Sequence, residues 1–117
     1  MIQHLSSPQY FGVQVKILIR RIKTYSYFFE SFNLGLPKIT RNDLNFAEGE
    51  LRRQVFDIVR LDVPRNIKSD EMIESIVGAC DRYKLPKKFF DSHIQLIVDR
   101  IRNAKLSTRQ NRTRTAR

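Results

Sequence analysis

Apolar residues recur along this chain at intervals of three and four positions, the spacing of residues on one face of an α-helix. No strong alternation of strand type and no repeated unit accompanies them. The pattern therefore predicts an all-α fold, an antiparallel bundle of about four helices. We expect helices over residues 13–32 and 44–60, a third from residue 69 to a break at residues 84–85, and a fourth from residue 86 or 87 to 101.

The first two helices are marked by their ends and by their buried stripes. The first ends in the aromatic run 25-YSYFFESF-32, after which Asn33, Gly35 and Pro37 interrupt a helix. Gly49 weakens the second helix by about 1 kcal/mol relative to alanine. The second helix is expected to bury Leu44, Ala47, Leu51, Val55, Ile58 and Val59.

The third and fourth helices form the most strongly marked pair. Ser69 is the expected N-cap of the third, and acidic residues in its first turn suit the helix dipole. Pro86 is tolerated in the first turn of the fourth. The short break predicts an antiparallel hairpin over residues 69–101. Its predicted apolar positions are Met72, Ile73, Ile76, Val77 and Cys80 on one helix, and Phe89, Phe90, Ile94, Ile97, Val98 and Ile101 on the other.

Positive charge is concentrated at the C-terminal end. The chain of 117 residues has 22 Lys and Arg against 12 Asp and Glu, a net charge of +10. From residue 100 onward no residue is acidic, and from about Ser107 no apolar side chain is larger than that of Ala116, so residues 105–117 are predicted to be a basic disordered tail. Its candidate nucleic-acid contacts are Arg100, Arg102, Lys105, Arg109, Arg112, Arg114 and Arg117.

The N-terminal segment is also free of acidic residues as far as Phe29. Lys16, Arg20, Arg21 and Lys23 lie among apolar residues there, a profile typical of a mitochondrial targeting segment over residues 1–30. A basic surface helix of the folded domain explains the same residues equally well. No apolar run approaches the ~20 residues of a membrane span. The sequence leaves peripheral contact with a membrane as an alternative. Residues 31–104 are assigned to one helical domain.

The candidate chemical groups favour structural roles. His93 has no second His or Cys at metal-ligand spacing, and Cys80 lies in an apolar stripe typical of an inert buried thiol. Asp70 and Glu74 share a helix face, but acidic residues in a first turn are common at capped helices. We therefore predict no catalytic residue, no metal site and no cofactor.

Four segments together resemble a known family: 32-FNLGLPKI-39, 51-LRRQVFDIV-59, 63-VPRN-66 and 76-IVGACDRYKLPKKFF-90. In order and spacing they are similar to the squalene/phytoene-synthase-like family, in particular to its mitochondrial complex I assembly factor branch. The resemblance implies part of an isoprenoid-synthase-like fold, a protein partner, and a location in the mitochondrial matrix or at the inner-membrane face. A family domain is more than twice this long, so the chain is expected to be a fragment, a truncated product or a reduced paralogue.

The departures from the family argue against an enzyme. Enzymes of this family hold Mg²⁺ and diphosphate with two Asp-x-x-x-Asp clusters, and no Asp here is followed by another four residues later. The preferred hypothesis is therefore a non-catalytic mitochondrial protein related to the assembly factor. The alternative is a small basic helical protein that binds RNA or a ribosome through the tail. A truncated prenyl-diphosphate synthase is the third.

Overall fold

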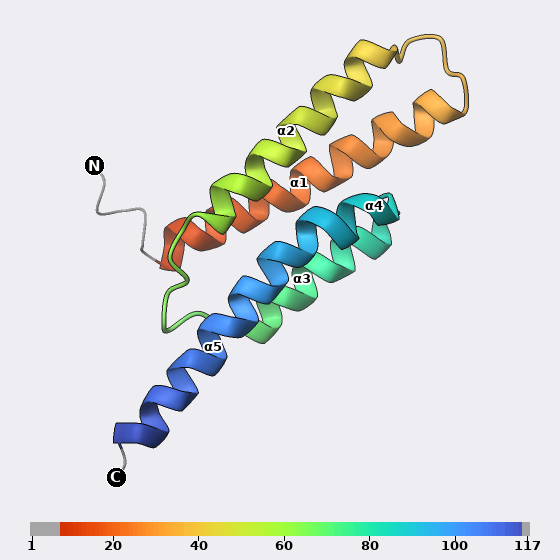
Figure 1. Ribbon diagram of the computed structural model, residues 1–117. Helices are drawn as coiled ribbons and strands as arrows, with labels where there is room; N and C mark the ends of the chain where they lie inside the picture. Colours follow the sequence, from red (N-terminus) through yellow and green to blue (C-terminus); the bar gives the residue numbers. More distant parts are fainter. Residues whose placement is uncertain (1–7, 116–117) are drawn as a thin grey trace.

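The computed structural model describes residues 8–115, and the side chains of residues 10–105 within them. The described part is all-α, as predicted: α1 (Pro8–Asn33), α2 (Arg41–Val59), α3 (Ser69–Arg82), a single turn α4 (Lys87–Phe89), a π-helical turn η2 (Phe90–Ile94) and α5 (Gln95–Thr115) (Figure 1). None of these helices is long and apolar enough to span a membrane.

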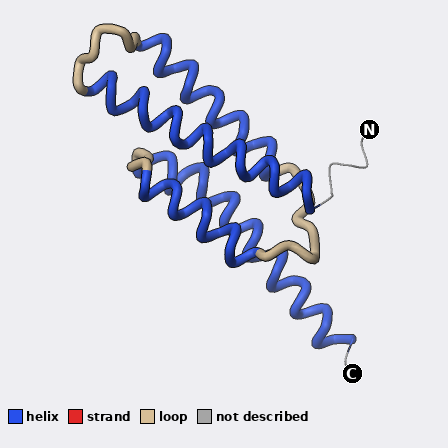
Figure 2. The backbone as a smooth tube through the Cα atoms, turned by 180° about the vertical axis from the view of Figure 1, so that it is seen from behind, coloured by secondary structure: helices blue, strands red, loops and turns tan. Residues whose placement is uncertain are grey.

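Two antiparallel helical hairpins stack to form the bundle. α1 packs against α2, and α3 packs against α5, which confirms the hairpin predicted over residues 69–101. Figures 1 and 2 show the first hairpin lying on the second, with α1 beside α3 and α2 beside α5. The neighbours contributed by different hairpins run in the same direction. The resulting bundle is elongated, with extents of 64 × 31 × 18 Å.

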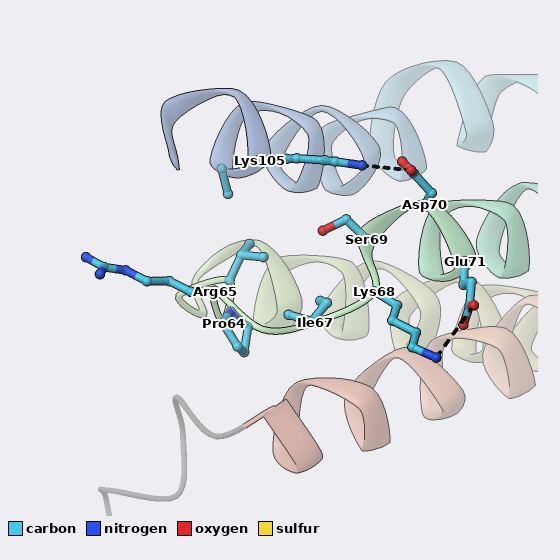
Figure 3. Close-up of a pocket in the computed structure, with 10 residues that line it drawn as sticks. Pro64, Arg65, Ile67, Lys68, Ser69, Asp70, Glu71 and Lys105 are labelled. Atoms are coloured by element: carbon cyan, nitrogen blue, oxygen red, sulfur yellow. Dashed lines mark hydrogen bonds and ion pairs between the residues drawn. The ribbon is translucent and has the colours of Figure 1, made fainter. Parts of the chain in front are cut away.

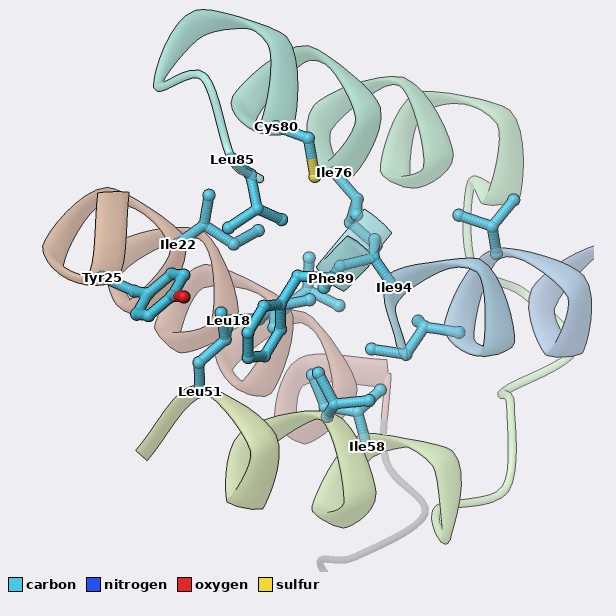
Figure 4. Close-up of a cluster of buried hydrophobic side chains, with 14 of the residues drawn as sticks. Leu18, Ile22, Tyr25, Leu51, Ile58, Ile76, Cys80, Leu85, Phe89 and Ile94 are labelled. Atoms are coloured by element: carbon cyan, nitrogen blue, oxygen red, sulfur yellow. The ribbon is translucent and has the colours of Figure 1, made fainter. Parts of the chain in front are cut away.

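The apolar core draws on all four long helices. The side chains of Leu51, Ile76 and Ile97, from α2, α3 and α5, are almost completely inaccessible to solvent. Figure 4 shows side chains from different helices converging on Phe89. Every residue of the predicted stripes is buried or partly buried. α1 adds five side chains to this core, Phe11, Val15, Leu18, Ile22 and Tyr25. Part of the segment expected to target the protein therefore belongs to the folded unit.

The helix ends show why the chain breaks where it does. At α2, the Thr40 side chain accepts a hydrogen bond from the backbone N–H of Asp43 (3.2 Å), and the Asp43 carboxylate accepts one from the N–H of Thr40 (3.0 Å). This reciprocal capping box satisfies N–H groups that have no partner inside the helix. At α3, the N-cap is Lys68, with no side-chain cap. The prediction that Ser69 caps α3 is therefore wrong, since Ser69 is the first helical residue.

A Schellman motif ends α3 and starts the turn to α4. The N–H of Leu85 bonds to the carbonyl of Cys80 (2.9 Å), and the N–H of Lys84 bonds to that of Asp81 (3.3 Å). Lys84 has a φ of +55°, the left-handed conformation that glycine usually provides in this motif. Leu85 is buried directly after it. The hairpin therefore depends on one residue in a costly backbone conformation.

The fourth predicted helix is not a uniform α-helix, because the π-helical turn η2 interrupts it. In a regular α-helix Phe89 and Ile94, five positions apart, would point about 140° away from each other. Both are completely buried here. The wider turn brings both side chains to the core.

The C-terminal segment continues α5 instead of forming the disordered tail predicted for residues 105–117. The backbone is helical to Thr115 and extends beyond the end of the bundle (Figure 1). No proline or glycine follows residue 100, so nothing in the sequence interrupts the helix. The prediction of disorder was based on the absence of large apolar side chains in this segment. Their absence means that the segment cannot pack in a core, but it does not end a helix that has already begun. Residues 116 and 117 lie outside the described part.

Candidate functional site

A row of basic residues lies on the outer face of α1. Lys16, Arg20 and Lys23, followed by Tyr27, are spaced four, three and four residues apart, so they form one line along the helix. All four are exposed. At 1.5 Å per residue the three cations are separated by about 6 and about 4.5 Å along the axis. We call these four residues the α1 basic stripe.

The positive charge of the α1 basic stripe is not compensated locally. Within the described residues, no ion pair involves Lys16, Arg20 or Lys23. The Lys23 ammonium lies 5.9 Å from the centre of the Tyr83 ring, a contact that leaves its charge in place. The neighbouring Arg21 differs, because it turns toward α2 and meets Glu50 at 3.4 Å. The stripe therefore presents three cations to any anion that approaches α1.

A shallow groove between α1 and α3 borders the stripe. It has a volume of about 230 Å³, with Val15, Ile19 and Met72 among its apolar lining residues. Lys16 belongs to both the groove and the stripe. Lys68, at the other side of the groove, pairs with Glu71 at 3.9 Å. The uncompensated charge near the groove therefore comes from α1.

A larger pocket of about 480 Å³ lies where the linker after α2 meets the start of α3 and the middle of α5 (Figure 3). Its charged groups are largely paired with one another. Lys105 meets Asp70 at 2.7 Å and Lys68 meets Glu71, while Arg65 points away from the pocket. The first pair links α3 to α5, and the second links the first turn of α3 to Lys68, its N-cap residue. Little unpaired charge is therefore left in the pocket for a ligand.

The candidate contacts predicted in the tail do not form one surface in the described residues. The Arg100 guanidinium donates a hydrogen bond to the Leu61 carbonyl (3.2 Å), and Lys105 is paired with Asp70. Both side chains therefore hold α5 to the bundle. Arg102 is exposed. The side chains of the other candidates, Arg109, Arg112, Arg114 and Arg117, lie outside the described part.

A polar cluster surrounds the π-helical turn. Glu48 meets Arg52 at 3.3 Å and Lys88 at 3.9 Å, and burial together with the Glu48 charge raises the pKa of Tyr25 to about 12. The His93 ring stacks on Phe89 with 5.0 Å between ring centres. Burial of His93 and the positive charge of Arg52 lower its pKa, which Glu48 partly opposes, and its Nδ1 atom has no hydrogen-bond partner in the described part. The cluster was not anticipated, because its members come from three separate segments.

The remaining candidate groups show no ligand geometry. Cys80 is a free, buried cysteine, and burial and the nearby Asp81 raise its pKa to about 12, so the thiol is protonated at neutral pH. Among the residues that the structure describes, no three His, Cys, Asp or Glu side chains are grouped to hold a metal ion. Asp70, which shares a helix face with Glu74, is paired with Lys105.

Comparison with known proteins adds no relative to this picture. No family model, curated protein or solved structure matches the chain. The resemblance to the squalene/phytoene-synthase-like family therefore stays a prediction from the four sequence segments.

The α1 basic stripe could have been predicted from the sequence, since positions 16, 20, 23 and 27 already have helical spacing. What the sequence left open was which side of the helix faces solvent.

Proposed function

We propose that the protein binds nucleic acid and that the α1 basic stripe contacts the phosphate backbone. The observation that carries this proposal is the line formed by Lys16, Arg20 and Lys23, three exposed cations without ion-pair partners in the described residues. The opposite side of the same helix packs in the core through Leu18 and Ile22, so the cations are displayed on a rigid support. A rigid row of positive charge suits a polyanion of regular charge spacing.

The number of cations predicts the strength of the salt dependence. Contacts to three phosphates release counterions, so log K should fall against log salt concentration with a slope of about −2 for a single strand. This corresponds to an affinity loss of about 20-fold between about 50 and 200 mM salt.

The test replaces Lys16, Arg20 and Lys23 together by alanine in the full chain. We expect weaker binding to a labelled oligonucleotide and a slope reduced by about 2. The matched control changes the same charge elsewhere, with alanine at Lys38, Arg60 and Lys87, which are exposed on other elements. Equal losses in the two triple variants would show that only net charge matters, and the proposal would fail.

A second experiment separates the stripe from the C-terminal part of α5. Truncation after Lys105 keeps the Lys105–Asp70 ion pair (2.7 Å) and removes four arginines. If the tail carries the binding, as in the alternative hypothesis drawn from the sequence, truncation should reduce the salt slope by about 3. Under our proposal the truncated chain still binds, and the triple alanine variant of the stripe weakens it.

The assembly-factor function implied by the sequence resemblance is the second candidate, and one observation favours it. Phe46 and Phe56 on α2 are 70% and 52% exposed, so this helix offers two large apolar side chains to a protein partner. Replacing both by serine should abolish recovery of respiratory complex I subunits with the tagged protein. A fusion of residues 1–30 to a reporter tests the mitochondrial location. A cytosolic reporter and unchanged recovery would remove this candidate.

A further inference from the structure

We infer that the nucleic acid held by the α1 basic stripe is single-stranded, with one unpaired base stacked on Tyr27. This inference rests on the proposed function and specifies its ligand. Tyr27 lies one helical turn beyond Lys23 in the same line, and its side chain is 60% exposed. The stripe thus places an aromatic face directly after three cations. A strand whose phosphates contact the three cations would have a base close enough to stack on the Tyr27 ring.

The surroundings of Tyr27 suit a stacking role. The ring contacts Phe28 with 5.7 Å between ring centres and planes tilted by 51°, so the ring is supported by a neighbour but is not buried. The first acidic residue of α1, Glu30, is exposed three positions further along. Its negative charge disfavours a phosphate beyond Tyr27, so the row of phosphate sites ends where the ring begins.

The aromatic ring discriminates between single and double strands. In a duplex each base is stacked between its neighbours and paired, so it cannot lie flat on a side chain at the protein surface. Unpaired bases can leave the stack and lie on an aromatic ring, and base–aromatic stacking tolerates any sequence. A duplex would meet only the three cations and would lose the stacking contribution.

The experiment measures binding of the full chain to three labelled probes: a short oligouridine, the corresponding single-stranded DNA, and a duplex RNA of equal length. We expect tighter binding to both single strands than to the duplex. Tyr27→Ala should weaken single-strand binding about fivefold or more without changing the salt slope, because the phosphate contacts remain. Tyr27→Phe should bind within about twofold of the wild type, since the ring is kept.

The control is Phe46→Ala, which removes from α2 an aromatic ring that is 70% exposed. It should leave all three affinities unchanged. The inference is overturned if Tyr27→Ala binds single strands as tightly as the wild type, or if the duplex binds best. Those results would still be compatible with the proposed function as long as the triple alanine variant of the stripe binds more weakly than its charge-matched control. Preference for the RNA strand over the DNA strand would identify which single strand the stripe favours.

Discussion

Gln54 on α2 donates hydrogen bonds to Gln14 on α1, to the backbone carbonyl at 3.0 Å and to the side-chain amide oxygen at 2.9 Å. Gln54 is a buried polar residue in the interface between two helices that otherwise meet through apolar side chains. A buried amide is tolerated only when it has partners, so this pair favours one alignment of α1 along α2.

Replacing Gln54 by leucine should lower the free energy of unfolding by about 1 kcal/mol, because Gln14 loses its donor at a part-buried position. Urea denaturation measures the change. Gln95→Leu is the control, since Gln95 only reaches Asp99 on the exposed side of its own helix (2.9 Å). A Gln54→Leu variant as stable as the wild type would show that the pair contributes nothing to the interface.

Ile76→Ala and Ile97→Ala should each lower the free energy of unfolding by about 2–5 kcal/mol, since both side chains fill the core between α3 and α5. The same denaturation experiment applies. Leu96→Ala is the matched control, because Leu96 precedes Ile97 in sequence but is 47% exposed. Changes near zero at Ile76 and Ile97 would contradict the packing of the hairpin.

Lys84→Gly should stabilise the protein by up to about 1 kcal/mol. Lys84 has a φ of +55°, which glycine adopts without the steric cost that a side chain incurs. The gain is partly offset because glycine makes the unfolded chain more flexible. A rise in thermal unfolding temperature measures the effect. Lys87→Gly, three residues later in a helical turn, should destabilise instead, and equal effects of the two changes would contradict the explanation.

His93 should make stability fall as the pH falls from about 7.5 to about 5.5. Burial and Arg52 lower the pKa of His93 in the folded protein below its ordinary value of 6.5. The unfolded chain therefore takes up a proton at a higher pH than the folded protein does, so acidification favours unfolding and a higher pH favours folding. The stability due to neutral His93 is present above the unfolded pKa and is lost below it.

Urea denaturation at several pH values tests this dependence. His93→Gln should give a flatter stability profile between about pH 5.5 and 7.5, because the titrating group is removed. The change His4→Gln removes the other histidine of the chain and serves as the control. If His93→Gln keeps the wild-type pH profile, another group is responsible for it.

The elements and the core could be predicted from sequence because helical periodicity is a local property. The stripe Leu44, Ala47, Leu51, Val55 and Ile58 identifies one face of α2, and that face is buried. Local rules were less successful at the start of α3. Ser69 has a side chain that is common at N-cap positions. The helix α3 nevertheless begins at Ser69 itself, and Lys68 is the N-cap residue.

The sequence by itself determined the helical class, the breaks between helices and the apolar face of each helix, since all of these depend on residues within a few turns. Only the tertiary structure decided which polar residues meet. Gln14 and Gln54 are 40 positions apart, and Lys105 and Asp70 are 35 apart. Contacts over such separations depend on how the two helices of each hairpin pack against each other, which no local pattern encodes. Tertiary packing also occupies the side chains of Arg100 and Lys105, and it leaves the α1 basic stripe facing solvent.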